Sequence, residues 1–233
     1  MEEQTPPVGR NRRRLWILAP VLLLTVLSLI FLATRAVHWS LQQSKTRLLT
    51  LVDIEHPVED DYNVEFMLLG DGQMMDSRCV DDLEAMLADC RAAGGRPEIT
   101  ASFRTWGAQE RFYEERLTAL MAEQGLDEEA ARARLTRKIE APGYSEHQLG
   151  LAVDILEEGS ELPEEEQSDT LTLRWLRENA WRYGFILRYA ENKTAITGKD
   201  YRPWHFRYVG HEAAAQIVKL DLALEEYLEM FFS

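Results

Sequence analysis

The chain has 233 residues, enough for one domain of ordinary size with short extensions, and its 45% hydrophobic content and six tryptophans can supply a packed core. The net charge is −14. Residues 1–40 hold five arginines and two acids, so the rest of the chain carries −17. Phosphate groups would repel so acidic a body, which argues against a nucleic-acid-binding protein.

The first element in chain order is an uncharged run of 20 residues at 15–34. At about 1.5 Å per residue, a helix of this length just crosses a hydrocarbon core of about 30 Å. Arg12, Arg13 and Arg14 precede the run, and the positive-inside rule therefore keeps residues 1–14 in the cytoplasm as a short tail. We expect an uncleaved single-pass anchor with the acidic body outside the cell membrane. The alternative is a signal peptide, which would have a shorter apolar stretch.

A linker of residues 35–60 joins the anchor to a domain at 61–233, and residues 37–51 could form a helical stalk within it. The elements expected in the first half of the domain are a strand at 62–69, a turn at 70–72, a helix from Asp76 or Ser77 to Gly94-Gly95, a strand at 97–102, and a helical region at 108–139 that breaks near Gly125 and stops at Pro142-Gly143.

The second half is expected to mix strands with helices. Its elements are a strand at 149–156, an acidic solvated loop at 157–168, a helix at 171–183 ended by Gly184, a strand at 185–189, a turn or hairpin at 191–200, a strand at 204–209, and an amphipathic helix at 212–230. Strands and helices do not alternate regularly. This order predicts an α+β domain with a small antiparallel sheet and helices packed against it.

The two cysteines, Cys79 and Cys90, fall within one predicted helix. Eleven residues of continuous helix span about 16 Å. A disulfide needs Cα atoms within about 7 Å, so we expect both residues to be free thiols that face the core.

Two of the five histidines have unusual surroundings. His147 and His205 lie in glycine-, proline- or aromatic-rich segments, and Asp154 lies inside a predicted apolar strand. A buried carboxylate is costly unless it is paired or bound to a metal. Two histidines and one aspartate match the three protein ligands of a catalytic zinc ion, with a fourth position open. The spacing alone also allows a buried His–Asp hydrogen bond without any metal.

The motif S-x-H-x-x-G-x-A-x-D at 145–154, followed by P-W-H at 203–205, resembles the zinc D-alanyl-D-alanine carboxypeptidases of the VanY type, a family that includes VanX dipeptidases and L,D-carboxypeptidases. The wider similarity runs from about residue 62 to residue 210. It includes the segments at 99–105, 183–189 and 196–198.

The resemblance implies a role for each matching residue. His147, Asp154 and His205 would bind zinc. Arg104 would hold the carboxylate of a peptide or polarise the scissile carbonyl, because its guanidinium can form forked hydrogen bonds. Ser145 and Gln109 would help bind the substrate, and Trp204 would wall the pocket.

The resemblance also implies a substrate and a reaction. The substrate would be a peptidoglycan stem peptide that ends in D-alanine, and zinc-assisted hydrolysis would release the terminal D-amino acid. L,D-carboxypeptidase or endopeptidase specificity is an alternative within the same family.

The chain departs from the family at one position. The family pattern places a glutamate three residues before the last histidine, where it serves as the general base, and this chain has Arg202 there. Arginine stays protonated and cannot accept a proton. Loss of general acid–base help typically costs about 10²–10⁴-fold in rate.

Three accounts of Arg202 are open. Another carboxylate, such as Asp200, Glu146 or Glu212, could take the role of the base. The metal could act without a base and give a slow enzyme. The protein could instead be a catalytically impaired or inactive homologue that binds peptidoglycan.

Overall fold

The computed structural model describes residues 27, 30–31, 34–35, 47–59, 62–63, 65–70 and 72–232. The chain divides into two compact units, Met1–Arg47 and Leu48–Ser233. The predicted tail at 1–14, nearly all of the anchor at 15–34 and most of the stalk lie outside the described residues. Among the residues that are described, no helix is both long and apolar enough to cross a membrane. The second compact unit begins inside the range that the sequence assigns to the linker.

The second unit contains two small antiparallel sheets, where the sequence predicts one. The larger sheet has the strand order β3-β4-β6-β5, with β3 at Pro97–Ala101, β4 at Ala152–Glu157, β6 at His205–Tyr208 and β5 at Phe185–Leu187. The smaller sheet pairs β1 at Phe66–Leu68 with β2 at Met74–Asp76. All pairs are antiparallel. The α+β prediction is therefore confirmed, although the sequence analysis did not find β2.

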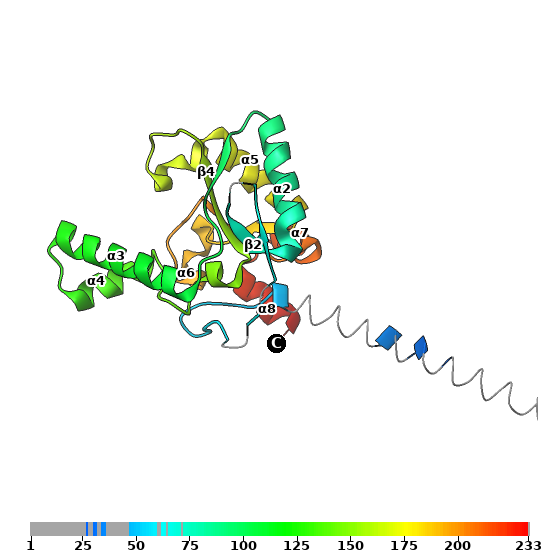
Figure 1. The fold of residues 1–233 in the computed structure, drawn as a ribbon, viewed down its shortest axis with the longest axis horizontal. Coiled ribbons are helices and arrows are strands. Elements are labelled where there is room, and N and C mark those ends of the chain that lie inside the picture. The colour runs from blue at the N-terminus through cyan, green and yellow to red at the C-terminus, as the bar shows by residue number, and fades with distance from the viewer. Residues whose placement is uncertain are drawn as a thin grey trace, which may run out of the picture. The chain divides into compact units, whose positions relative to one another are not determined.

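Helices of two kinds surround these sheets (Figure 1). The α-helices are α2 at Ser77–Ala92, α3 at Trp106–Gln124, α4 at Glu128–Leu135, α5 at Leu171–Asn179, α6 at Thr194–Thr197, α7 at His211–Leu220 and α8 at Leu224–Phe232. The 3-10 helices are η1 at Glu146–Leu149, η2 at Glu164–Asp169, η3 at Ala180–Tyr183 and η4 at Glu191–Lys193.

Helix α2 shows why the local sequence forms a helix. Asp76 caps it by accepting a hydrogen bond from the Arg78 backbone N–H. Its larger apolar side chains are buried at helical spacing: Cys79, Val80, Leu83, Met86, Leu87 and Cys90. Cys79 and Cys90 are buried free thiols, as predicted. Burial raises the pKa of the Cys90 thiol to about 11, so both residues pack as small apolar side chains.

Helices α3 and α4 form an arm that projects from the rest of the domain (Figure 1). Gly125 ends α3 in the left-handed conformation, with φ of +64°, at the position where the sequence predicts a break. The arm has its own small core of Tyr113, Leu117, Ala131 and Leu135, separate from the main core between α2, α5 and the larger sheet.

Some predicted elements differ in the structure. The single helix expected at 212–230 is split, because Asp221 adopts a left-handed φ of 51° between α7 and α8. The expected turn at 191–200 contains η4 and α6, and the acidic loop at 157–168 contains most of η2. Gly150 ends η1 with φ of +71°, so the strand expected from residue 149 starts only at Ala152.

Candidate metal centre

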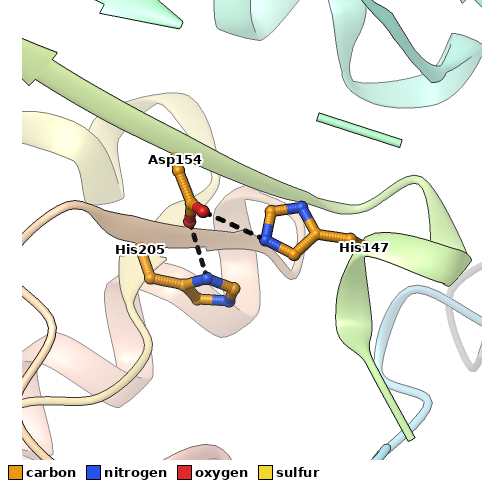
Figure 2. A group of neighbouring side chains, drawn as sticks. All are labelled: His147, Asp154 and His205. Carbon is orange, nitrogen blue, oxygen red and sulfur yellow. Dashed lines mark hydrogen bonds and ion pairs between the residues drawn. The ribbon is translucent and has the colours of Figure 1, made fainter. Parts of the chain in front are cut away.

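The three predicted ligands come together on one face of the larger sheet (Figure 2). Asp154 in β4 and His205 in β6 are direct partners in the antiparallel register. His147 lies in η1, and the turn at Gly150 brings η1 back over β4. Their ligand atoms all lie within 4.8 Å of one another. This set can hold a metal ion.

Each histidine turns one ring nitrogen toward Asp154 and the other toward a hydrogen-bond acceptor. His147 Nε2 lies 3.3 Å from Asp154 Oδ2, and its Nδ1 lies 2.8 Å from the Ser102 carbonyl oxygen. His205 Nδ1 lies 2.8 Å from Asp154 Oδ1, and its Nε2 lies 3.3 Å from Glu146 Oε2. A carbonyl only accepts, so it fixes the proton of His147 on Nδ1 and leaves Nε2 for a metal. Outer partners of this kind are typical of metal-binding histidines, and the residues therefore fit a metal ion.

Burial and mutual charge both act on the ionisation of this group. Burial alone would raise the pKa of Asp154, but His147 and His205 hold it well below its usual range. Burial lowers the pKa of His147. Burial also acts to lower the pKa of His205, but Asp154 and Glu146 raise it above its usual value. The aspartate is therefore an anion at any ordinary pH, as a metal ligand requires.

Arg104 follows β3 and lies beside the three ligands. Its Nη2 lies 3.8 Å from Asp154 Oδ2, and its Nη1 donates to Gln109 Oε1 at 3.0 Å. The buried Nε atom has no hydrogen-bond partner in the part of the chain that the structure describes. Burial lowers the pKa of Arg104, which stays a cation because arginine starts so high. A buried cation with an unused donor is suited to bind an anionic group of a ligand.

A cavity of about 790 Å³ opens above the ligands and continues along the arm. Arg104 and Trp204 line it, as expected for residues that contact a substrate. Gln109 and Ser145 are buried at 1% and 0% exposure and lie outside its lining. Gln109 instead links Arg104 to the Glu140 carbonyl, to which its Nε2 donates at 2.6 Å.

Arg202 lies in the wall of the same cavity and is paired with an acid. Its Nη2 lies 2.9 Å from Glu140 Oε1 and 3.2 Å from the Arg137 carbonyl oxygen, and its guanidinium stacks on the Tyr189 ring at 4.6 Å. Lys199 Nζ lies 3.3 Å from the same Glu140 oxygen. Burial would raise the pKa of Glu140, but Arg202 and Lys199 lower it to about 2. The cation at position 202 is thus paired with a carboxylate that it shares with Lys199.

Sequence analysis missed Glu140, which lines the cavity together with the ligands. The one signal was Arg202 itself, because a buried cation needs an acid partner.

The sequence offers Glu146, Asp200 and Glu212 as replacements for the general base, and the structure gives each of them different surroundings. Both oxygens of Glu146 contact His205 or buried arginines. Asp200 lines the cavity and pairs with Arg137 at 2.7 Å. Glu212 lies in the first turn of α7, outside the cavity lining.

Comparison with known proteins agrees with this geometry. The family model described as VanY, D-alanyl-D-alanine carboxypeptidase, matches residues 72–211. The chain belongs to the VanY family. The three candidate metal ligands, Arg104 and Arg202 all lie within the matched range.

A D-alanyl-D-alanine carboxypeptidase of Enterococcus faecalis (strain ATCC 700802 / V583) is 40% identical over 180 residues, which cover 77% of this chain and 65% of that protein. Two solved structures are also similar. A variant of the vancomycin-resistance D,D-pentapeptidase VanY from a VanB-type cassette, in complex with Zn(II), has a TM-score of 0.71 at 40% identity and covers 78% of this chain and 99% of that chain. VanYB in complex with D-alanine-D-alanine has a TM-score of 0.72 at 39% identity, with 78% and 98% coverage.

Proposed function

We propose that this chain is a zinc-dependent D,D-carboxypeptidase that removes the terminal D-amino acid from peptidoglycan stem peptides. The supporting observation is the buried group of His147, Asp154 and His205 at the base of a cavity that Arg104 also lines. The solved relatives in complex with Zn(II) and with D-alanine-D-alanine support the choice of metal and substrate. Zinc, when bound, supplies a Lewis acid that polarises a carbonyl and acidifies water.

Arg104 is proposed to bind the terminal carboxylate of the peptide. Its guanidinium is 17% exposed and can form charge-assisted hydrogen bonds to one or both carboxylate oxygens. Gln109 holds the guanidinium in place from behind. Ser145 Oγ has no hydrogen-bond partner among the described residues, but it is buried, so we assign it a supporting role below the cavity floor.

Glu140 is proposed as the proton acceptor in place of the glutamate missing at position 202. It is ionised, lines the cavity and lies close enough to His205 for that ring to affect its pKa. In the reaction, the oxygen of water forms a bond to the scissile carbonyl carbon and the C–N bond breaks. Glu140 would take the proton from the water and return it to the departing amine. Arg202 and Lys199 hold the carboxylate in position, but they also make it a weak base, which predicts a slow enzyme.

A second candidate function is non-catalytic binding of peptidoglycan peptides. The low pKa of Glu140, about 2, favours this function because so weak a base gives little help to proton transfer. The cavity and Arg104 would still bind the peptide in that case.

The test is D-alanine release from a muramyl pentapeptide by the zinc-loaded full chain, in the presence and absence of a chelator. Turnover that the chelator abolishes supports the peptidase. The Glu140→Gln variant should then lose at least about 10²-fold in kcat, and the double variant Glu140→Gln/Arg202→Glu should recover part of that loss. Peptide binding without turnover by the natural chain would favour the second candidate. Unchanged turnover in Glu140→Gln would reject Glu140 as the base.

We also propose that residues 15–34 anchor the protein in the cell membrane with the domain outside. The supporting observations are the uncharged run and the arginines that precede it. Protease added to intact cells whose wall has been removed should cleave the domain. Protection of the domain under those conditions would show that this topology is wrong.

A further inference from the structure

Glu146 lies behind the metal centre and is completely buried. Its Oε2 lies 3.3 Å from His205 Nε2. Its Oε1 accepts from Arg188 Nε and from Arg207 Nη1, each at 2.8 Å. The side chains of Glu146 and Arg207 are 0% exposed, and that of Arg188 is 1% exposed. One carboxylate thus joins two buried arginines to a metal-binding histidine.

Each arginine continues the connection to a distant part of the domain. Arg188 forms a bidentate pair with Glu225 of α8, with Nη2–Oε1 at 2.7 Å and Nη1–Oε2 at 2.9 Å. Arg207 Nη2 donates to the backbone carbonyl oxygens of Leu48 and Thr50, at 3.0 and 2.9 Å. The outer partner of His205 is therefore held from both the first residues of the domain and its last helix.

The Glu225 contact determines how Arg188 presents its Nε donor. A bidentate pair fixes the plane of the guanidinium, and the fixed plane sets where Glu146 Oε1 is held. The position of Glu146 then sets where the ring N–H of His205 can donate. The four charged groups, Glu146, Arg188, Arg207 and Glu225, sum to zero. Without Glu225 they carry one excess positive charge, which draws Glu146 toward the arginines and opposes a cation at His205.

We infer that Glu225 on α8 is a positioning residue for the metal centre, acting through Arg188 and Glu146 on His205. The inference rests on the metal site of the proposed function. Glu225 touches neither the cavity nor a ligand, and its effect should appear first in metal affinity. Changes in the outer partners of metal ligands typically cost about 10–100-fold in affinity, and Glu225→Gln should lie near the lower end of that range.

The test uses the full chain and compares Glu225→Gln with Glu226→Gln. Glu226 is a matched control because it is on the same helix and carries the same charge. It accepts from the Ala223 N–H and pairs with Lys193, and it has no contact with Arg188. We would measure zinc affinity by competition with a chelator, together with the absorption spectrum of the cobalt-substituted protein and the unfolding midpoint of the metal-free protein.

The expected result is about a tenfold loss of zinc affinity and a changed cobalt spectrum for Glu225→Gln, with neither change for Glu226→Gln. Glu225→Asp should recover part of the affinity, and it replaces Glu225→Gln if that variant does not fold. Equal zinc affinity and equal spectra in both variants, with a lower unfolding midpoint for Glu225→Gln, would overturn the inference and leave a purely structural ion pair. The proposed function would survive that result. It would fail if the natural chain bound no zinc, or if it bound the peptide without turnover.

Discussion

The two sides of the cavity are built from different kinds of interaction. On the sheet side, His147, Asp154 and His205 are held by strand pairing and by buried hydrogen bonds. On the arm side, the segments at 136–140 and 199–202 are joined by ion pairs and by backbone acceptors, and some of these pairs are half exposed. The sheet side is held mainly by backbone pairing and contacts between buried side chains. The arm side holds the pair of Arg202 and Glu140, and Arg202 occupies the position at which the family resemblance implies a glutamate.

The largest expected effect concerns the sheet side. His147→Ala removes a ligand, so zinc affinity should fall by more than the roughly 100-fold that loss of an outer partner costs. Competition with a chelator measures this. His56→Ala is the control, because the side chain of His56 is 54% exposed and pairs with Asp53. Equal affinity in the two variants would exclude His147 as a ligand.

Arg104 should give the next largest effect. Arg104→Gln removes a charge-assisted contact worth about 1.5–3 kcal/mol, so kcat/KM or peptide affinity should fall about 10–100-fold. Arg116→Gln is the control, because Arg116 also lines the cavity and stacks on the same Phe112 ring as Arg104. Similar losses in both variants would mean that only the general positive charge of the cavity matters.

The ionisation of Glu140 makes the stability of the protein depend on pH. Its pKa of about 2 lies below the ordinary value of 4.5, so its pairing stabilises the fold fully above about pH 4.5 and loses that effect as the pH falls toward 2. Glu140→Gln should therefore cost up to about 3 kcal/mol at pH 7, and the difference should shrink toward pH 3. Urea unfolding at the two pH values measures this. Glu123→Gln, at an exposed acid in the cavity lining, should show no such trend. A constant difference across pH would contradict the assignment.

The smallest effect is expected for an exposed ion pair on the arm side. Arg137 and Asp200 lie 2.7 Å apart with side chains 54% and 41% exposed. Solvent and salt screen such a pair, and Asp200→Asn should cost only about 0.2–1 kcal/mol. Urea unfolding at low and high salt would check this. A loss above about 2 kcal/mol would show that the arm is held more tightly than its exposed pair implies.

Much of the fold could be predicted from local signals. Asp76 caps the start of α2, and Gly125 ends α3 in the left-handed conformation. Both residue types favour these positions, so both helix ends could be predicted from the sequence. The split at Asp221 could not be predicted, because an aspartate in the left-handed conformation is uncommon and the apolar spacing continues on both sides. Short 3-10 helices such as η4 are set by tertiary contacts and leave little periodicity to detect.

The candidate site likewise contains residues that could be predicted from the sequence and one that could not. His147, Asp154 and His205 were predicted because their motif has fixed spacing. Glu140 was not, because its role comes from Arg202, which lies 62 positions further along the chain and meets it only in the folded protein. Charge pairs between distant segments cannot be derived from periodicity or from local motifs.

The direct pairing of Asp154 with His205 across β4 and β6 has a consequence for assembly. Successive side chains of a strand point to opposite faces, so a slip of one residue between these strands would separate the two ligands. A misfolded chain with shifted strands would keep every residue of the motif and still be unable to bind zinc. Metal binding would then distinguish correctly paired molecules from misfolded ones.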